Sequence, residues 1–354
     1  MNRIELFQEL TGAFGISGYE EEITGILKKH FGDRVTMMRD GIGSLIAKKS
    51  GAAEQPKIMF AAHMDEIGFM VKSITKKGFI KFLTMGGWYE GNLPGLRVQV
   101  KTKNGMVPGV IGQKAIHDLP EEERKKLPKV DHMYIDVGAT HEYDIKEKLG
   151  IRPGDPVIPD YPFVQLANKD LCMAKAWDDR VGCALLVDLL NNLSAADHPN
   201  TVYLTGTVQE EVGLRGARTS AFSIAPDIGF ALDVSLCRDT PGNDDDSPEK
   251  LGSGVGILIR DSTMIPHTKL RDFVCELAEH NNIPYHFTSI KGGYDTGVIH
   301  ITKYGVPSLA IGIPTRYVHS GSSIISLTDY EHVLNLITLI VKNLDAEALK
   351  NILI

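Results

Sequence analysis

The chain has 354 residues, enough for about two domains at roughly 150 residues each, and its 43% hydrophobic content predicts a globular protein. A net charge of −7 with no basic stripe argues against a dedicated nucleic-acid-binding protein. The four cysteines form no C-x-x-C pair, and neither a signal peptide nor an apolar run of the roughly 20 residues that a membrane span needs is present. These features predict a cytoplasmic protein with no membrane partner.

The first 72 residues begin an α/β pattern. Ser17 and Glu20 have the spacing of a capping box and precede apolar residues at helical spacing, so a helix is expected to start there. A short apolar strand at residues 57–62 then leads to His63.

Between residues 73 and 165 the helical period disappears. Short alternating strands such as residues 97–103 are followed by Asn104 and Gly105, a strong hairpin signal. This region is therefore predicted to be a small β-rich, barrel-like module.

From residue 166 onward, apolar strands alternate with helices, which indicates βαβ units and a mostly parallel sheet. The predicted fold class is α/β, with one domain formed by residues 1–72 plus 166–354 and interrupted by an inserted β domain at residues 73–165. The expected elements of the last segment are a helix at about 180–193, strands at 201–208, 228–233 and 306–313, and a final helix at roughly 328–344.

Polar residues that directly follow apolar strands are the first candidates for chemistry, because ligands of open α/β sheets gather at the carboxyl ends of the strands. A single histidine or acidic doublet is more often structural or solvated. The Glu210–Glu211 pair stands out because the apolar strand 202–208 precedes it and a Gly-rich turn follows. The candidates are His63, Asp65, Asp178, Glu210, Glu211, Asp233 and His319.

As a set, two imidazoles and several carboxylates at strand ends match a dinuclear, zinc-like site. Zinc accepts imidazole nitrogen and carboxylate oxygen, and a pair of metals needs a carboxylate that bridges them. The spacing of His63 and Asp65 would let this carboxylate reach the other imidazole nitrogen if the strand bends there.

Six segments in order along essentially the whole chain resemble the tetrahedral-type (TET) dinuclear metallo-aminopeptidases, a family that includes glutamyl, leucyl and lysyl aminopeptidases. The segments are AHMDEIGF, AWDDRVG, TVQEEVGLRGA, ALDVS, GGYDTG and YVHS. The resemblance implies two divalent ions per subunit, with zinc as the first candidate and cobalt or manganese as alternatives. It implies these roles: His63 and Asp233 hold one metal, Glu211 and His319 hold the other, Asp178 bridges both, Glu210 is the general acid/base, and Asp65 orients His63.

Some residues in and around these segments carry no such role. Asp179 and Arg180 match the family motif but are interpreted as support for a helix start. Tyr294 stands where the family more often has threonine, which leaves its contacts with substrate open. His117 lies in the insert, where the family has no ligand, so a surface or subunit contact is expected.

The implied function is release of N-terminal residues from short peptides by a metal-activated water with Glu210 as general base. The close alternative is an N-acyl amino-acid deacylase or carboxypeptidase, whose extra domain typically falls later in the chain. A glycoside hydrolase would use paired carboxylates, but the chain has only two tryptophans to stack against sugar rings. A protein that binds metals without catalysis would be expected to lack the general base, but Glu210 is present.

The resemblance also implies a homo-oligomer, a dodecamer built from dimers through the inserted domain. The preferred N-terminal residue stays open. Arg238 or Arg260 would favour acidic side chains and the loop at residues 244–246 basic ones, although such charges are more often solvated.

Overall fold

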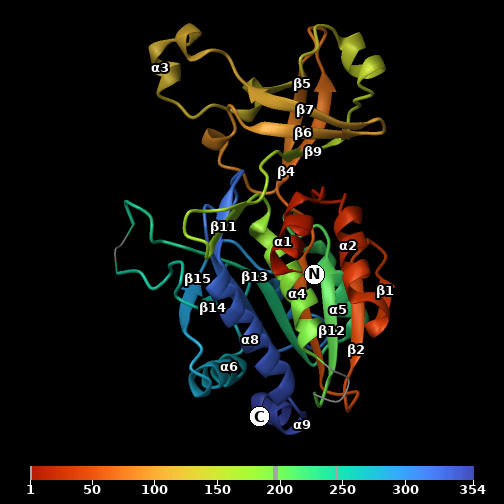
Figure 1. The fold of residues 1–354 in the computed structure, drawn as a ribbon, viewed down its shortest axis with the longest axis vertical. Helices are drawn as coiled ribbons and strands as arrows, with labels where there is room; N and C mark the ends of the chain where they lie inside the picture. The colour runs from red at the N-terminus through yellow and green to blue at the C-terminus, as the bar shows by residue number, and fades with distance from the viewer. Residues whose placement is uncertain (1, 194–197, 244–245) are drawn as a thin grey trace.

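The computed structural model describes residues 2–193, 198–243 and 246–354, and Figure 1 shows two parts. A large sheet carries helices on both faces, and a closed barrel of six strands stands beyond one end of it. The predicted fold class, an α/β domain interrupted by a small β barrel, is confirmed. None of the helices in the described ranges is long and apolar enough to cross a membrane.

The large sheet has eleven strands, and the four strands at its centre, in the order β12, β3, β13 and β16, run parallel. Antiparallel strands extend both edges. The strands are β1 (Thr36–Arg39), β2 (Leu45–Ser50), β3 (Lys57–His63), β10 (Val164–Gln165), β11 (Leu171–Ala174), β12 (Thr201–Thr207), β13 (Ile228–Leu236), β14 (Val255–Arg260), β15 (Tyr285–Ser289), β16 (Ser308–Arg316) and β17 (Ser323–Ser326).

Helices cover both faces because successive side chains of each buried strand point to opposite sides. In β3, Phe60 packs in the core with α4, while Met59 and Ala61 pack with α5 and α7 on the other face. The helices are α1 (Arg3–Gly12), α2 (Glu21–Phe31), α3 (Glu121–Arg124), α4 (Trp177–Asn192), α5 (Arg215–Ile224), α6 (Thr268–His280), α7 (Thr296–Ile299), α8 (Leu327–Asn343) and α9 (Ala346–Leu353).

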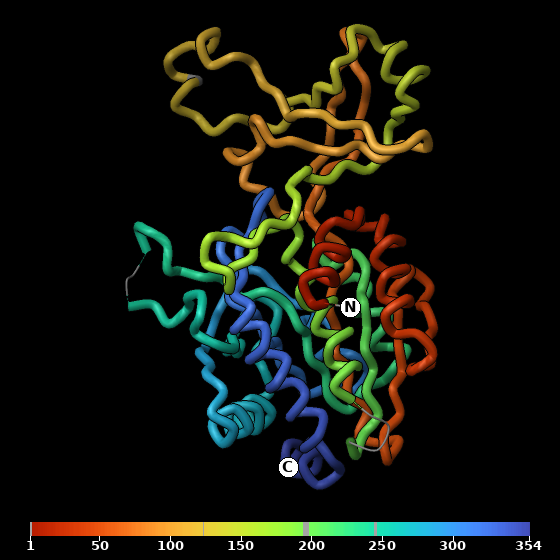
Figure 2. The backbone as a smooth tube through the Cα atoms, viewed as in Figure 1, coloured from red at the N-terminus to blue at the C-terminus, as the bar shows by residue number. Residues whose placement is uncertain are grey.

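The barrel closes in the order β4, β5, β8, β7, β6 and β9 around its own apolar core. Figure 2 shows the chain leaving the large sheet for the barrel and returning to it before α4. The predicted hairpin at Asn104 and Gly105 joins β6 to β7, and Thr102 pairs with Gly105. The strands are β4 (Gly68–Ile74), β5 (Ile80–Met85), β6 (Arg97–Thr102), β7 (Gly105–Gly112), β8 (Tyr134–Asp136) and β9 (Pro156–Pro159).

The expected boundaries of the insert differ from the strand pairing at both ends. Strand β4 begins before residue 73, and β10, at the end of the predicted 73–165 range, pairs with β11 in the large sheet. The division into two domains at those residues stays a prediction.

The expected helix start at Ser17 is wrong. Helix α2 begins at Glu21 without a side-chain cap, and the Ser17 hydroxyl instead donates to the Asp65 carboxylate at 2.6 Å. A long-range partner therefore replaces the local capping interaction. The first helix, α1, has the capping box, formed by Asn2 and Glu5.

Candidate metal centre

The carboxyl ends of the central parallel strands meet at one edge of the large sheet and bring the candidate residues together. His63 is the last residue of β3 and pairs with Thr207, the last residue of β12. Asp233 lies near the end of β13, next to β16, which leads to His319. This is the edge at which an open α/β sheet binds its ligands.

Asp178 lies at the centre of the cluster. Its Oδ1 is 2.8 Å from Nε2 of His63, and its Oδ2 is 3.3 Å from Nε2 of His319. The two oxygens of one carboxylate thus face two different imidazoles. The His319 ring is also 3.4 Å from Oε1 of Glu211, and the His63 ring is 3.9 Å from Oδ2 of Asp233.

The start of α4 holds Asp178 in place. Asp178 and Asp179 have non-helical backbone angles, and the peptide bond between them is cis. The buried Asp179 carboxylate accepts from the Gly182 amide at 2.9 Å and from the His63 amide at 3.0 Å. Asp179 therefore caps the helix, as expected, and also ties it to β3.

Glu210 and Glu211 do not continue the strand before them. Strand β12 ends at Thr207, and Gln209 has a left-handed backbone with a φ of 56°. The two glutamates therefore do not alternate as successive residues of a strand would. Both side chains instead line one cavity, together with His63 and His319.

Two buried carboxylates hold the glutamate turn. Asp65 accepts the amides of Glu210 and Glu211 at 3.0 and 3.2 Å, and Oε1 of Glu20 accepts the Gln209 amide at 3.0 Å. Asp65 also lies beside His63, where its backbone carbonyl is 3.0 Å from Nδ1 and its carboxylate is 3.6 Å away. The carbonyl is thus the nearer partner of the imidazole, and the carboxylate mainly positions the glutamates.

The electrostatics of the cluster fit divalent cations. Burial, opposed by the charge of His63, raises the pKa of Glu210 well above its usual value, and burial together with Asp178 raises the pKa of Asp233. For Asp178, burial is outweighed by hydrogen bonds from His319 and His63, which lower its pKa. Buried carboxylates in such numbers need compensating positive charge.

Orphaned atoms support the same interpretation. Oε1 of Glu211 and Oδ1 of Asp295 are buried and accept no hydrogen bond from the described residues. Two overlapping groups bring ligand atoms within 4.8 Å of one another, namely His63 with Asp178 and Glu211, and His63 with Glu210 and Asp233. Imidazole nitrogens with carboxylate oxygens are the donor set that zinc and similar ions accept.

Asp295 and Gly86 are site residues that sequence reasoning missed. Asp295 precedes α7, and its Oδ2 accepts from the Thr207 hydroxyl at 2.6 Å. Burial raises the pKa of Asp295 to about 6. Gly86, just after β5 of the barrel, has a φ of 78°, and a Cβ there would lie 2.8 Å from Oε2 of Glu211. The position of Asp295 in GGYDTG was the available signal, whereas nothing local marked Gly86.

The other candidates lie elsewhere. His117 is exposed in the barrel, Arg238 pairs with Glu249, and Arg260 is exposed and does not line the cavity of the cluster. Of the loop proposed to favour basic residues, 244–246, positions 244 and 245 lie outside the described residues.

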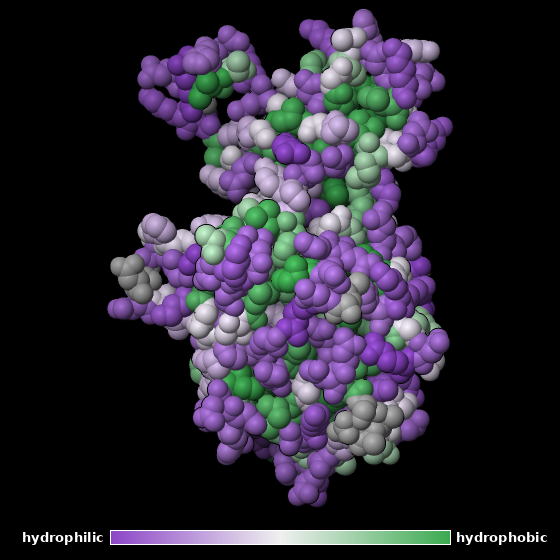
Figure 3. All heavy atoms as spheres, in the orientation of Figure 1, coloured by the Kyte–Doolittle hydropathy of each residue, from purple (hydrophilic) through white to green (hydrophobic). Residues whose placement is uncertain are grey.

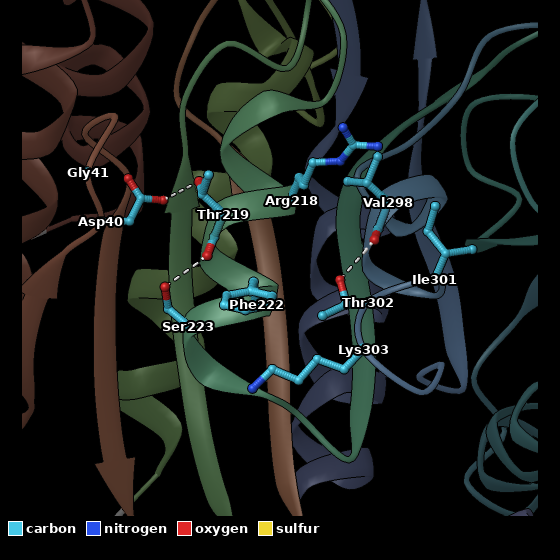
Figure 4. A pocket seen from close by; sticks show the side chains of 10 residues that line it. All are labelled: Asp40, Gly41, Arg218, Thr219, Phe222, Ser223, Val298, Ile301, Thr302 and Lys303. Atoms are coloured by element: carbon cyan, nitrogen blue, oxygen red, sulfur yellow. Dashed lines mark hydrogen bonds between the residues drawn. The ribbon is translucent and has the colours of Figure 1, made fainter.

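A separate cavity of about 550 Å³ between α5 and α7 offers less chemistry (Figure 4). Among its described lining residues there is no histidine, and its carboxylate, Asp40, already accepts the hydroxyls of Thr219 and Ser220 at 2.7 and 2.9 Å. Asp40 also accepts three backbone amides of its own turn. Its role is therefore structural.

Comparison with known proteins identifies the family. The sequence model of the M42 glutamyl aminopeptidase family matches residues 43–336. The chain belongs to the M42 peptidase family. It is 39% identical over 348 residues to the putative aminopeptidase FrvX of Escherichia coli, covering 97% of this chain and 96% of the relative.

Solved structures of TET peptidases superpose closely on this chain. A TET aminopeptidase from a marine sediment archaeon of the Thaumarchaeota gives a TM-score of 0.95 at 40% identity, covering 99% of both chains. The TET1 peptidase of Pyrococcus horikoshii, which can assemble into a tetrahedron or a large octahedral shell, gives 0.86 at 32% identity, covering 97% of this chain and 100% of that one. The predicted aminopeptidase family is thereby confirmed.

Proposed function

We infer that this M42 peptidase is a dinuclear metallo-aminopeptidase that releases N-terminal residues from short peptides. The observation that carries the inference is the placement of Asp178, whose two carboxylate oxygens face the imidazoles of His63 and His319. A carboxylate with one partner on each oxygen is suited to lie between two cations.

His63 and Asp233 would hold one cation, Glu211 and His319 the other, and Asp178 would contact both. Oε1 of Glu211 favours this assignment, because it is buried and accepts no hydrogen bond although Nε2 of His319 lies 3.4 Å away, and such an oxygen is costly to bury unless a cation approaches it. Zinc is the first candidate, and cobalt or manganese suit the same nitrogen and oxygen donors.

Glu210 is proposed as the general acid/base. Two bound divalent cations would polarise the scissile carbonyl and lower the pKa of a water. Glu210 lines the cavity, and its Oε2 lies 3.9 Å from His63. It would take a proton from the attacking water and return it to the leaving amine. Asp65 and Glu20 keep the glutamate turn in position for both transfers.

The deciding experiment combines hydrolysis with metal analysis. Protein stripped by a chelator should hydrolyse no aminoacyl-nitroanilide, and readdition of Zn²⁺ or Co²⁺ should restore hydrolysis together with about two ions per subunit. N-acyl amino acids and cellulose oligomers, tested in parallel, should not be cleaved. Full hydrolysis by protein shown to be metal-free would refute the dinuclear site.

We propose that the barrel mediates self-assembly of the chain. Several large apolar side chains of the barrel region are exposed, and Figure 3 shows hydrophobic atoms scattered among the polar ones there. Scattered apolar side chains are common on protein surfaces, so the main support for association is the similarity to proteins that assemble. The similarity to PhTET1, whose structure holds a dodecamer, favours a dodecamer, which we propose is built from dimers. The exposed residues are Leu83, Tyr89, Met106, Val110, Ile116, Leu127 and Tyr143.

A further inference from the structure

The cavity that contains the cluster, of about 720 Å³, extends well beyond the proposed metal ligands. Its remaining walls come from the residue Gly87 after β5, the turn before α5, the end of β13, the segment after β14, the segment before α7 and the turn before His319. These walls are mostly apolar. Apart from four glycines, they consist of Leu214, Val234, Leu236, Thr263, Ile290, Lys291, Tyr294 and Val318.

The two hydroxyls in these walls are already engaged within the protein. The Tyr294 hydroxyl donates to the Val234 carbonyl at 2.9 Å, and the Thr263 hydroxyl donates to the Asp261 carboxylate at 2.8 Å. Tyr294 therefore offers the cavity its ring rather than a free donor. Ile290 packs against the small apolar cluster that includes Tyr294, and both residues line the cavity.

Charge in these walls is confined to one exposed side chain, Lys291. Within the described part of the chain, no carboxylate outside the proposed metal centre lines the cavity. A basic substrate side chain would find carboxylates only in the proposed metal centre, where bound cations would compensate them. An acidic side chain would find only the exposed ammonium group of Lys291 as counter-charge outside that centre. Burial of an unpaired charge is strongly unfavourable.

We propose that the enzyme selects peptides whose N-terminal side chain is neutral and apolar, of the size of leucine or methionine. This inference rests on the proposed aminopeptidase function. Ile290 is a specificity-determining residue. It lies in the wall without contributing a ligand atom, so it acts on the substrate side chain and not on the metal centre. Met and Leu side chains gain free energy in proportion to the apolar surface they bury there.

The wild-type test is a panel of leucyl-, methionyl-, glutamyl- and lysyl-nitroanilides at saturating Zn²⁺ or Co²⁺. We expect kcat/KM for the leucyl and methionyl substrates to exceed the charged ones by at least about tenfold, the usual worth of an apolar pocket. Free leucine should also raise the Tm more than free glutamate or lysine does. Faster cleavage of the glutamyl or lysyl substrate would overturn the proposal and leave the aminopeptidase function intact. Cleavage of none of the four would refute the proposed function itself.

Matched variants localise the preference. Ile290→Lys should lower kcat/KM for the leucyl substrate by about tenfold or more and raise the glutamyl-to-leucyl ratio. The control, Ile259→Lys, places the same charge on β14, at a half-exposed residue outside the cavity lining, and should leave that ratio unchanged. Equal glutamyl-to-leucyl ratios of kcat/KM in wild type and Ile290→Lys would show that Ile290 does not determine specificity.

Discussion

Replacing Asp65 by asparagine tests whether the glutamate turn depends on one carboxylate. Its Oδ1 accepts the Glu210 amide, and its Oδ2 accepts the Glu211 amide and the Ser17 hydroxyl. Asparagine has one acceptor oxygen and one NH₂ group. Whichever way the amide lies, one of the two backbone amides will face an NH₂ group in a fully buried site.

The loss of one acceptor oxygen sets the expected loss of stability and activity. Loss of one hydrogen bond to a charged acceptor, in a buried position, should lower the free energy of unfolding by about 1.5–3 kcal/mol. Turnover should fall by about 10- to 100-fold, because small displacements of positioned groups are costly to catalysis. Metal content should stay near wild type, since Asp65 is not among the proposed ligands.

The assay measures kcat with the best nitroanilide, Tm and bound metal for Asp65→Asn and for a control, Asp40→Asn. Asp40 is a carboxylate that accepts backbone amides and two hydroxyls beside the second cavity (Figure 4). The control should lose stability but keep its turnover. Wild-type turnover in Asp65→Asn, or an equal loss in Asp40→Asn, would refute the positioning role.

Four further outcomes are expected. Glu210→Gln should retain two metals and lose about 10² to 10⁴ in turnover, the usual worth of a general acid/base. Glu211→Ala should instead lose one metal. The reversed pattern would mean that Glu211 is the base and Glu210 the ligand. Chelation should lower the Tm as well as abolish activity, because cations that bind only the folded state stabilise it. Burial raises the pKa of Glu20 from 4.5 to about 7, so the stability it contributes is present below about pH 4.5 and is lost as the pH rises through 7. Glu20→Gln keeps Oε1 as acceptor and should therefore raise the Tm relative to wild type at pH 8 but not at pH 5. Light scattering at micromolar concentration should give a large oligomer, and an active monomer would contradict the assembly.

The sheet and its site could be predicted because the decisive signals are local. Buried parallel strands are continuous apolar runs, so β3, β12 and β16 lie within three residues of their expected ends. Once these strands are parallel, the polar residues after them must meet at one edge. His63 and the Glu210–Glu211 pair could thus be placed without knowledge of any side-chain contact.

The remaining features depend on partners that are distant in sequence. Ser17 has a plausible local capping role, yet its hydroxyl donates to a residue 48 positions away. Asp295 accepts from Thr207 only because the residue before α7 lies against the end of β12, and Gly86 approaches Glu211 only because the end of β5 lies near the glutamate turn. Local spacing has no access to such contacts, because each arises from the packing of two complete elements.

The walls of the cavity differ in how closely they are coupled to the proposed metal centre. Tyr294 donates to the carbonyl of Val234, the residue after Asp233, so a change at Tyr294 would disturb both the substrate wall and a proposed ligand. Ile290 packs against the apolar cluster that includes Tyr294, and its backbone amide donates to the Arg260 carbonyl and not to a residue of the proposed metal centre. A substitution at Ile290 is therefore expected to change the proposed specificity and leave the proposed ligands in place. A wall with this separation lets one catalytic arrangement serve different N-terminal residues through substitutions that leave its ligands untouched.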